Sequence, residues 1–92
     1  MPRASDHNQA RIVADLRKLG VSVCDIHSVG HGCPDIICGW RGFTFAFEIK
    51  QPGAALTPDE TAWHAAWGGM VGIIHDAAEV IEIMELFAEE HE

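Results

Sequence analysis

The sequence predicts an α/β fold in which a mixed four-stranded sheet is flanked by helices, in the order α-β-β-β-α-β-α. Three observations lead to this prediction. Residues 43–50 alternate between apolar and polar side chains, which is typical of a strand with one buried face. Capping residues precede three segments of helical periodicity. With 92 residues, 48% of them hydrophobic, we expect residues 1–92 to form a single domain.

The first helix is expected over residues 8–19, where apolar residues recur at helical spacing. Asp6 is the predicted N-cap, and Gln9 stands three residues later, as in a capping box. Gly20 follows the last periodic residue, where helices commonly end.

Two strands and a tight reversal are predicted next. Residues 21–28 have the composition of a strand, and the glycines and proline of residues 29–34 indicate a turn. Residues 35–40 form a short, largely apolar segment that predicts a buried strand. Arg41 and Gly42 follow it as a two-residue reversal, so we expect a hairpin.

The strand after this reversal, residues 43–50, has the clearest pattern in the chain. Its aromatic residues lie on one face, whereas Glu48 and Lys50 lie on the other. Asp35 begins the preceding strand. Pairing of the two strands through the reversal would bring the carboxylates of Asp35 and Glu48 to the same end of the hairpin.

The C-terminal part predicts a helix, a strand and a final helix. Thr57 is the N-cap of the middle helix, Pro58 takes its first position and Glu60 completes a capping box. That helix is expected to end near the glycines at 68 and 69. Residues 70–75 form a short apolar strand, and Asp76 begins a third capping motif before the last helix.

Asp35, Glu48 and Lys50 are the residues from which chemistry can be argued. Two carboxylates within a few ångström repel each other, and a divalent cation allows both to stay ionised. Mg²⁺ prefers oxygen ligands and keeps positions open for water or phosphate. A lysine beside such a site can hold the attacking water or stabilise charge on a phosphate. The alternative is a turn acid and a solvated Glu–Lys pair, which contributes little.

These residues also carry a resemblance to a known family. The motif GCPD at residues 32–35, twelve further residues and then EIK at residues 48–50 resemble the PD-(D/E)XK nuclease signature. The pairs NQ at residues 8–9 and the segment LTPDE at residues 56–60 resemble the small, phage-associated VRR-NUC-type branch of that superfamily.

This resemblance implies a restriction-endonuclease-like core and an endonuclease that cleaves double-stranded or branched DNA with Mg²⁺ or Mn²⁺. It implies that Asp35, Glu48 and the carbonyl of Ile49 are metal ligands and that Lys50 is the catalytic lysine. Many relatives have a glutamate in the first helix where this chain has Gln9, whose amide oxygen can ligate without charge. It also implies a homodimer.

A second hypothesis is a catalytically weak or inactive relative that uses the nuclease fold as a binding or assembly module. It is motivated by Gln9 in place of an acid and by the scarcity of cations, since the net charge is −8. Residues 76–92 hold seven acids and no Lys or Arg, so most of this charge belongs to the last helix. Arg41, Arg11 and His31 are the candidate contacts to DNA phosphates, with an ordinary solvated surface as the alternative.

Cys24, Cys33 and Cys38, together with nearby histidines, allow a zinc-binding interaction domain as a third hypothesis, although buried thiols explain them more simply. Trp63 and Trp67 form one stripe on the middle helix that fits core packing, a dimer face or base stacking. The absence of a signal sequence and of long apolar runs leads us to expect a cytoplasmic protein without membrane contact.

Overall fold

The computed structural model describes residues 4–91, with side chains from residue 8 onward. Its elements confirm the predicted order and add a short 3-10 turn, η1. They are α1 (Ala4–Lys18), β1 (Ser22–Asp25), η1 (His27–Val29), β2 (Ile36–Trp40), β3 (Phe43–Ile49), α2 (Pro58–Ala66), β4 (Val71–Ile74) and α3 (Ala77–His91). None of the helices in this described part is long and apolar enough to cross a lipid bilayer.

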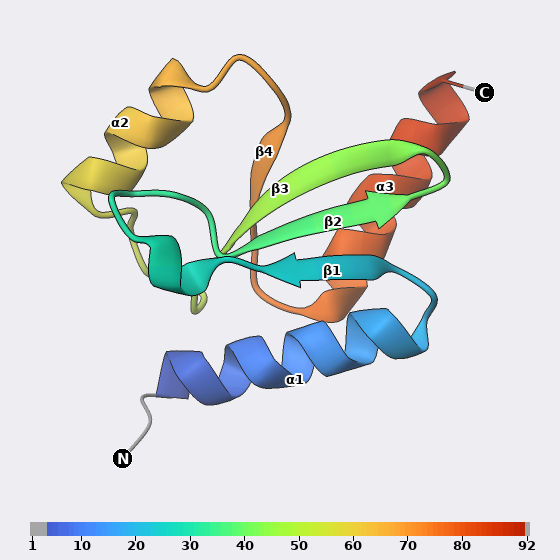
Figure 1. Cartoon of the computed structure of the whole chain (residues 1–92), viewed down its shortest axis with the longest axis horizontal. Helices are drawn as coiled ribbons and strands as arrows, with labels where there is room; N and C mark the ends of the chain where they lie inside the picture. Colours follow the sequence, from blue (N-terminus) through green and yellow to red (C-terminus); the bar gives the residue numbers. More distant parts are fainter. Residues whose placement is uncertain (1–3, 92) are drawn as a thin grey trace.

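The four strands form one mixed sheet in the order β1-β2-β3-β4. β1 and β2 are antiparallel, as are β2 and β3, whereas β3 and β4 are parallel. Because a parallel pair needs a long crossover connection, the chain passes through α2 between β3 and β4 (Figure 1). The predicted mixed α/β sheet is therefore confirmed.

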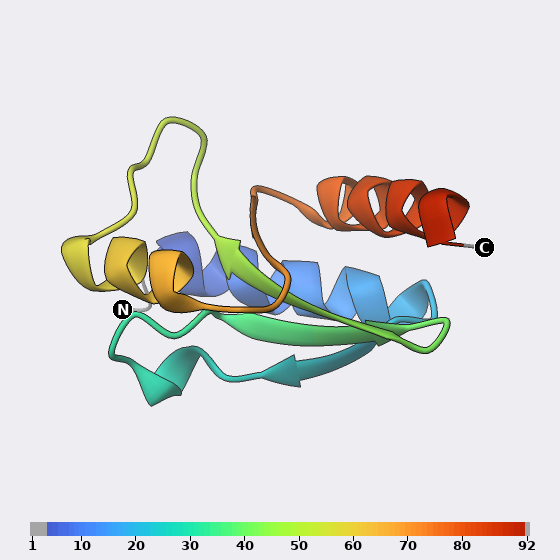
Figure 2. The ribbon, with the colours of Figure 1, turned by 90° about the horizontal axis from the view of Figure 1, so that it is seen from above.

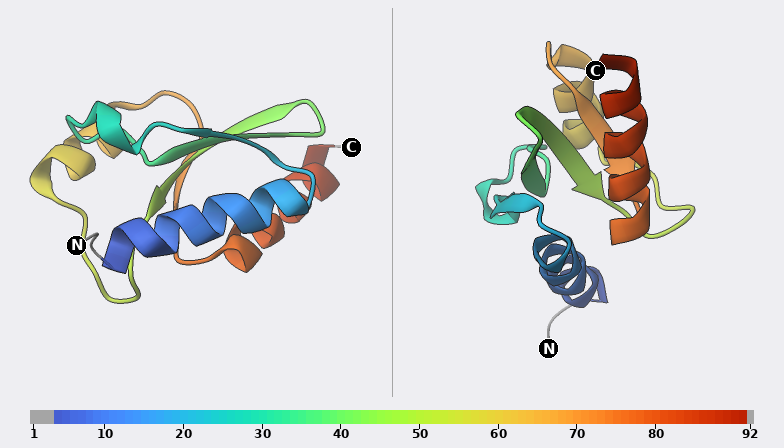
Figure 3. Two further views of the ribbon diagram at one scale, coloured as in Figure 1. Left: turned by 60° about the horizontal axis from the view of Figure 1, so that its bottom comes forward. Right: turned by 90° about the vertical axis from the view of Figure 1, so that its right-hand side faces the viewer.

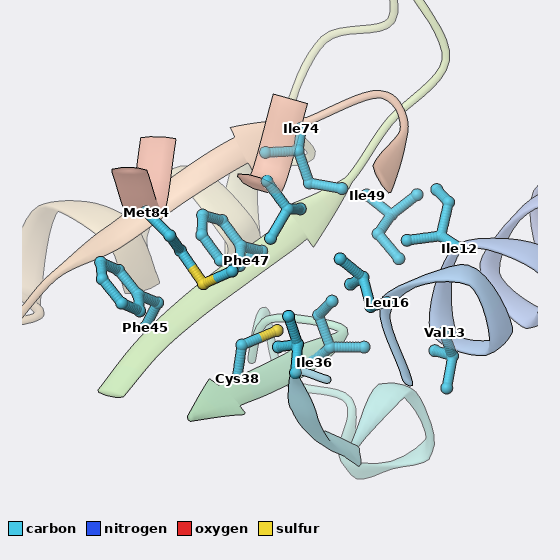
Figure 4. Packing of buried hydrophobic residues seen from close by; sticks show 12 residues of the cluster. Ile12, Val13, Leu16, Ile36, Cys38, Phe45, Phe47, Ile49, Ile74 and Met84 are labelled. Atoms are coloured by element: carbon cyan, nitrogen blue, oxygen red, sulfur yellow. The ribbon is translucent and has the colours of Figure 1, made fainter. Parts of the chain in front are cut away.

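The hydrophobic core lies between the sheet and the helices α1 and α3. The two helices contact each other as well as the sheet, and Figure 3 shows them side by side. The core side chains converge from both helices and from the strands (Figure 4). Its fully buried members include Leu16, Ile36, Phe47, Ile74 and Met84. The aromatic face predicted for β3 supplies the centre of this core.

The middle helix α2 lies at one end of the sheet, beside η1 and beyond the end of β3 (Figures 1 and 2). No residue of α2 is buried. Core packing is therefore the wrong explanation for Trp63 and Trp67, whose rings instead stack on each other at 4.6 Å between centroids. This end of the sheet is also where Asp35 and Glu48 are found.

Two element boundaries differ by three residues or more from the sequence prediction. α1 begins at Ala4, so Asp6 is a helical position instead of the N-cap and Gln9 does not complete a capping box. β1 ends at Asp25, three residues early, because the Asp25 carboxylate accepts the N–H of His27 at 3.2 Å. Such a turn of an aspartate onto its own backbone commonly ends a strand.

The two other predicted capping motifs are formed, one of them in part. Thr57 Oγ1 accepts the Glu60 N–H at 3.2 Å, and Glu60 Oε1 accepts the Thr57 N–H at 2.8 Å, a complete box. At α3 the Asp76 carboxylate accepts the Glu79 N–H at 2.9 Å. In a complete box the Glu79 carboxylate would accept the N–H of Asp76. It accepts the N–H of His75, one residue earlier, at 2.7 Å.

Candidate active site

The structure brings Asp35 and Glu48 together across the β2–β3 hairpin. Ile36 pairs with Phe47 at the end of the antiparallel register, so Glu48, the next residue of β3, faces away from the core. The carboxyl of Asp35, the residue that precedes β2, lies beside the Glu48 carboxyl. The Asp35 N–H donates to the carbonyl of Phe47 at 3.1 Å. Asp35 Oδ2 in turn accepts the N–H of Ile49 at 2.7 Å. These two hydrogen bonds fix the Asp35 carboxylate against the end of β3.

Glu48 is buried in a manner that is unusual for a carboxyl group. The residue is only 2% exposed, and its Oε1 atom is buried without a hydrogen-bond partner. Burial, together with the neighbouring carboxyls of Asp35 and Glu60, raises the pKa of Glu48 to about 9. A divalent cation between Asp35 and Glu48 would supply the missing partner and keep both groups ionised. The donor set therefore fits a hard cation.

Lys50 is held beside these carboxyls by an ion pair that the sequence did not indicate. Its Nζ lies 2.7 Å from Glu60 Oε1, and both side chains are 17% exposed. The hydrogen bond that Lys50 donates to Glu60 raises the pKa of Lys50, with smaller contributions from the charges of Glu60, Glu48 and Asp35. Partial burial would raise the pKa of Glu60, but the hydrogen bonds with Lys50 and Thr57 outweigh it and lower that pKa. The ammonium and the Glu60 carboxylate are thus both charged at neutral pH.

Gln9 is buried and contacts Asp25. The Gln9 Nε2 atom donates to Asp25 Oδ1 at 2.9 Å, and His27 Nδ1 lies 2.6 Å from the same oxygen. Asp25 pairs with Ile36, a core residue, so its side chain is on the core face of the sheet, whereas Glu48 is on the other face. The sequence did not predict Asp25 as its partner. The role of Gln9 as a metal ligand stays a prediction.

The three candidate DNA contacts lie in different places. Arg41 is at the tip of the hairpin, with its guanidinium 4.2 Å from the centroid of the Trp40 ring. It is six residues along the chain from Asp35, which corresponds to roughly 20 Å in an extended strand. Arg11 is exposed on α1, with Nε 3.8 Å from Asp15. His31 is exposed in the loop that leads into Asp35, four residues before it.

The cysteines do not form a metal site. Cys24 is exposed, Cys33 is partly exposed and Cys38 is buried. Cys38 pairs with Val23, and Cys24 pairs with Ile37, so the first and last thiols lie on opposite faces of the sheet. Across residues 8–91, whose side chains the structure describes, no three His, Cys, Asp or Glu side chains converge to hold an ion. The structure gives the zinc hypothesis no support, and a cation at Asp35 and Glu48 would need water or substrate to complete its coordination.

Comparison with known proteins identifies the fold. No family model matches this sequence, and no curated protein matches it. A solved structure described as "VRR_NUC domain" matches with a TM-score of 0.68 and 20% sequence identity, covering 88% of this chain and 94% of that chain. The chain therefore has the fold of a VRR_NUC domain over nearly its whole length, as the resemblance of its motifs predicted.

Proposed function

We propose that this protein is a metal-dependent endonuclease that hydrolyses phosphodiester bonds of DNA, with Asp35, Glu48 and Lys50 as its catalytic residues. The observation that carries the proposal is the buried, unpartnered oxygen of Glu48 beside Asp35. A stable domain retains such an unfavourable group where a ligand needs it. The fold shared with a VRR_NUC domain supports the same conclusion.

Asp35, Glu48 and the carbonyl of Ile49 would hold Mg²⁺ or Mn²⁺. When bound, such a cation stabilises the charge that develops on the phosphate and lowers the pKa of a coordinated water. Lys50 stays protonated because of its hydrogen bond with Glu60. It therefore donates hydrogen bonds to the attacking water or the phosphate and does not act as a base. The Ile49 N–H keeps the Asp35 carboxylate in place.

Cleavage assays with Mg²⁺, Mn²⁺ and Ca²⁺ on plasmid, linear and four-way-junction DNA test this proposal. We expect cleavage with Mg²⁺ or Mn²⁺, little turnover with Ca²⁺, and loss of cleavage in Asp35→Ala, Glu48→Ala and Lys50→Ala. The matched control is Asp15→Ala, which removes an exposed acid on α1. Circular dichroism checks that each variant is folded. Full activity in any of the three site variants would overturn the assignment.

A non-catalytic binding or assembly module is the second candidate. It is favoured by Gln9, which stands in place of an acid and whose amide is held by Asp25. Absence of cleavage on all three DNA forms, together with absence of metal binding by calorimetry, would support the module over the enzyme.

We also propose that two copies of this chain form a homodimer. One active site cuts one strand, and a twofold pair of sites cuts both strands of a duplex. Met70 and Ile83 are 39% and 37% exposed, and with Phe87 they line an apolar hollow of about 320 Å³ that a second copy would cover. Sedimentation equilibrium should give a dimer for the wild type and a monomer for Ile83→Glu; a monomeric wild type would refute it.

A further inference from the structure

We propose that Glu60, in the first turn of α2, is a positioning residue that holds the Lys50 ammonium beside the Asp35–Glu48 carboxyl pair, and that the Glu60 side chain is therefore part of the active site. This inference rests on the proposed nuclease function and extends it to an element outside the core sheet. Its basis is the geometry around Glu60, which contacts two different donors and a neighbouring acid.

The carboxylate of Glu60 is fixed from two directions. Its Oε1 atom accepts the N–H of Thr57 at 2.8 Å and lies 2.7 Å from Lys50 Nζ. Its charge also acts on Glu48, whose pKa it raises. The capping box orders the Glu60 side chain independently of Lys50, so little further side-chain entropy of Glu60 is lost when the ion pair forms. An exposed ion pair lacks this advantage.

The loop that carries Asp35 contacts the same turn of α2. A Cβ atom placed on Gly32 would lie 2.3 Å from the backbone oxygen of Asp59 and 3.0 Å from the nitrogen of Glu60. Only a residue without a side chain allows this approach. Pro34, between Gly32 and Asp35, is fully buried. The positions of Asp35 and Glu60 are therefore coupled through direct backbone contact.

A lysine at the end of a strand would otherwise sample many rotamers and extend into water. Held by Glu60, its ammonium stays near the place where a scissile phosphate would be bound. Misplacement of a reacting group by about 1 Å lowers a rate by on the order of 100-fold. If Glu60 acted only as a cap, its loss would change stability and leave the turnover of the folded enzyme unaltered.

Steady-state kinetics of DNA cleavage separate these two roles. We expect Glu60→Ala to lower kcat by on the order of 10- to 100-fold with a smaller change in KM. Glu60→Gln should keep most of the activity, because its amide oxygen still accepts from Thr57 and Lys50. Asp59→Ala, which removes the neighbouring acid from the same turn, is the matched control and should retain wild-type kcat. An unchanged kcat in Glu60→Ala overturns the proposal.

Nitrogen-15 NMR of the lysine ammonium groups gives a second readout that requires neither metal nor DNA. The chain has two lysines, Lys18 and Lys50, and Lys18 is exposed. In Lys18→Arg the remaining ammonium signal belongs to Lys50, and we expect it to be slowed in its exchange with water by the ion pair. Adding Glu60→Ala should abolish this protection, whereas adding Asp59→Ala should not. Equal protection in both double variants overturns the proposal.

The two failures can be told apart. A wild-type protein that cleaves no DNA, with protected Lys50 signals, refutes the nuclease function and leaves the ion pair intact. A wild-type protein that cleaves DNA, with full kcat in Glu60→Ala, keeps the nuclease and refutes the positioning role.

Discussion

Glu48 combines deep burial with two neighbouring carboxyl groups, and this combination determines its chemistry. At neutral pH the metal-free side chain holds a proton, since its pKa is raised to about 9. A bound cation would displace that proton, so metal affinity should increase with pH. The same residue therefore connects protonation, metal binding and stability of the fold.

The metal-free protein should lose stability as pH rises. Between the unfolded pKa of 4.5 and the folded pKa of about 9, the folded state binds one more proton at Glu48 than the unfolded state does. The free energy of unfolding therefore falls over this range. Urea unfolding in a chelator at pH 5 and pH 8.5 should show a steeper loss for the wild type than for Glu48→Gln, which cannot ionise. Equal pH dependence of the two proteins would contradict the assigned protonation.

Gly32 shows how one residue can join two elements of the site. Its φ is +81°, and a Cβ there would meet the Asp59 carbonyl oxygen. We expect Gly32→Ala to destabilise the protein by roughly 1–3 kcal/mol and to lower cleavage, because both the loop and α2 must move. Thermal unfolding and cleavage rates measure the two effects.

The control for this substitution is Gly30→Ala. Gly30 also has a positive φ, +76°, but nothing lies within 4 Å of a Cβ placed there. Gly30→Ala therefore introduces the same backbone strain at a positive φ, but it disturbs no contact with α2. If both variants lose the same stability and activity, the contact between the loop and α2 has no role of its own.

Among the helices and strands, the sequence predicts those features that depend on neighbouring residues in the chain. The alternation in residues 43–50 identifies β3 with its buried and polar faces, and the Thr57–Glu60 motif locates the start of α2. The early end of β1 was not predictable, because the turn depends on the rotamer that brings the Asp25 carboxylate to the His27 N–H. The start of α1 at Ala4 similarly overrides a plausible N-cap at Asp6.

In the candidate site, too, local sequence patterns predict some features, whereas contacts between distant elements are not predictable from them. The hairpin register ends where Ile36 pairs with Phe47, and so it brings Asp35 and Glu48 to the same end of the hairpin, as the two-residue reversal at Arg41 and Gly42 predicts. The capping box is the explanation of Glu60 that the sequence favours over a functional role, because the ion pair with Lys50 spans the connection from β3 to α2 and no periodic pattern reports on such a contact. The partner of Gln9 was missed for the same reason, since Asp25 lies on another element.

At the scale of the whole molecule, one core supports a site on the other face of the sheet. α1 and α3 pack against the apolar face, which leaves the end of the polar face to Asp35, Glu48, Lys50 and α2. The acidic residues of α3, which are Glu79, Glu82, Glu85, Glu89 and Glu90, belong to a helix on the core side of the sheet. The net charge of −8 is therefore compatible with an anionic substrate at the opposite face.

Calorimetric titration of the metal-free protein with Mn²⁺ tests the central claim most directly, because it requires no assumption about the DNA substrate. We expect saturable binding of Mn²⁺ near neutral pH. Release of the Glu48 proton should make the measured heat depend on the ionisation enthalpy of the buffer. Binding should disappear in Asp35→Ala and persist in Asp15→Ala. No binding to the wild type, or equal binding to Asp35→Ala, would contradict a metal site at the end of this hairpin.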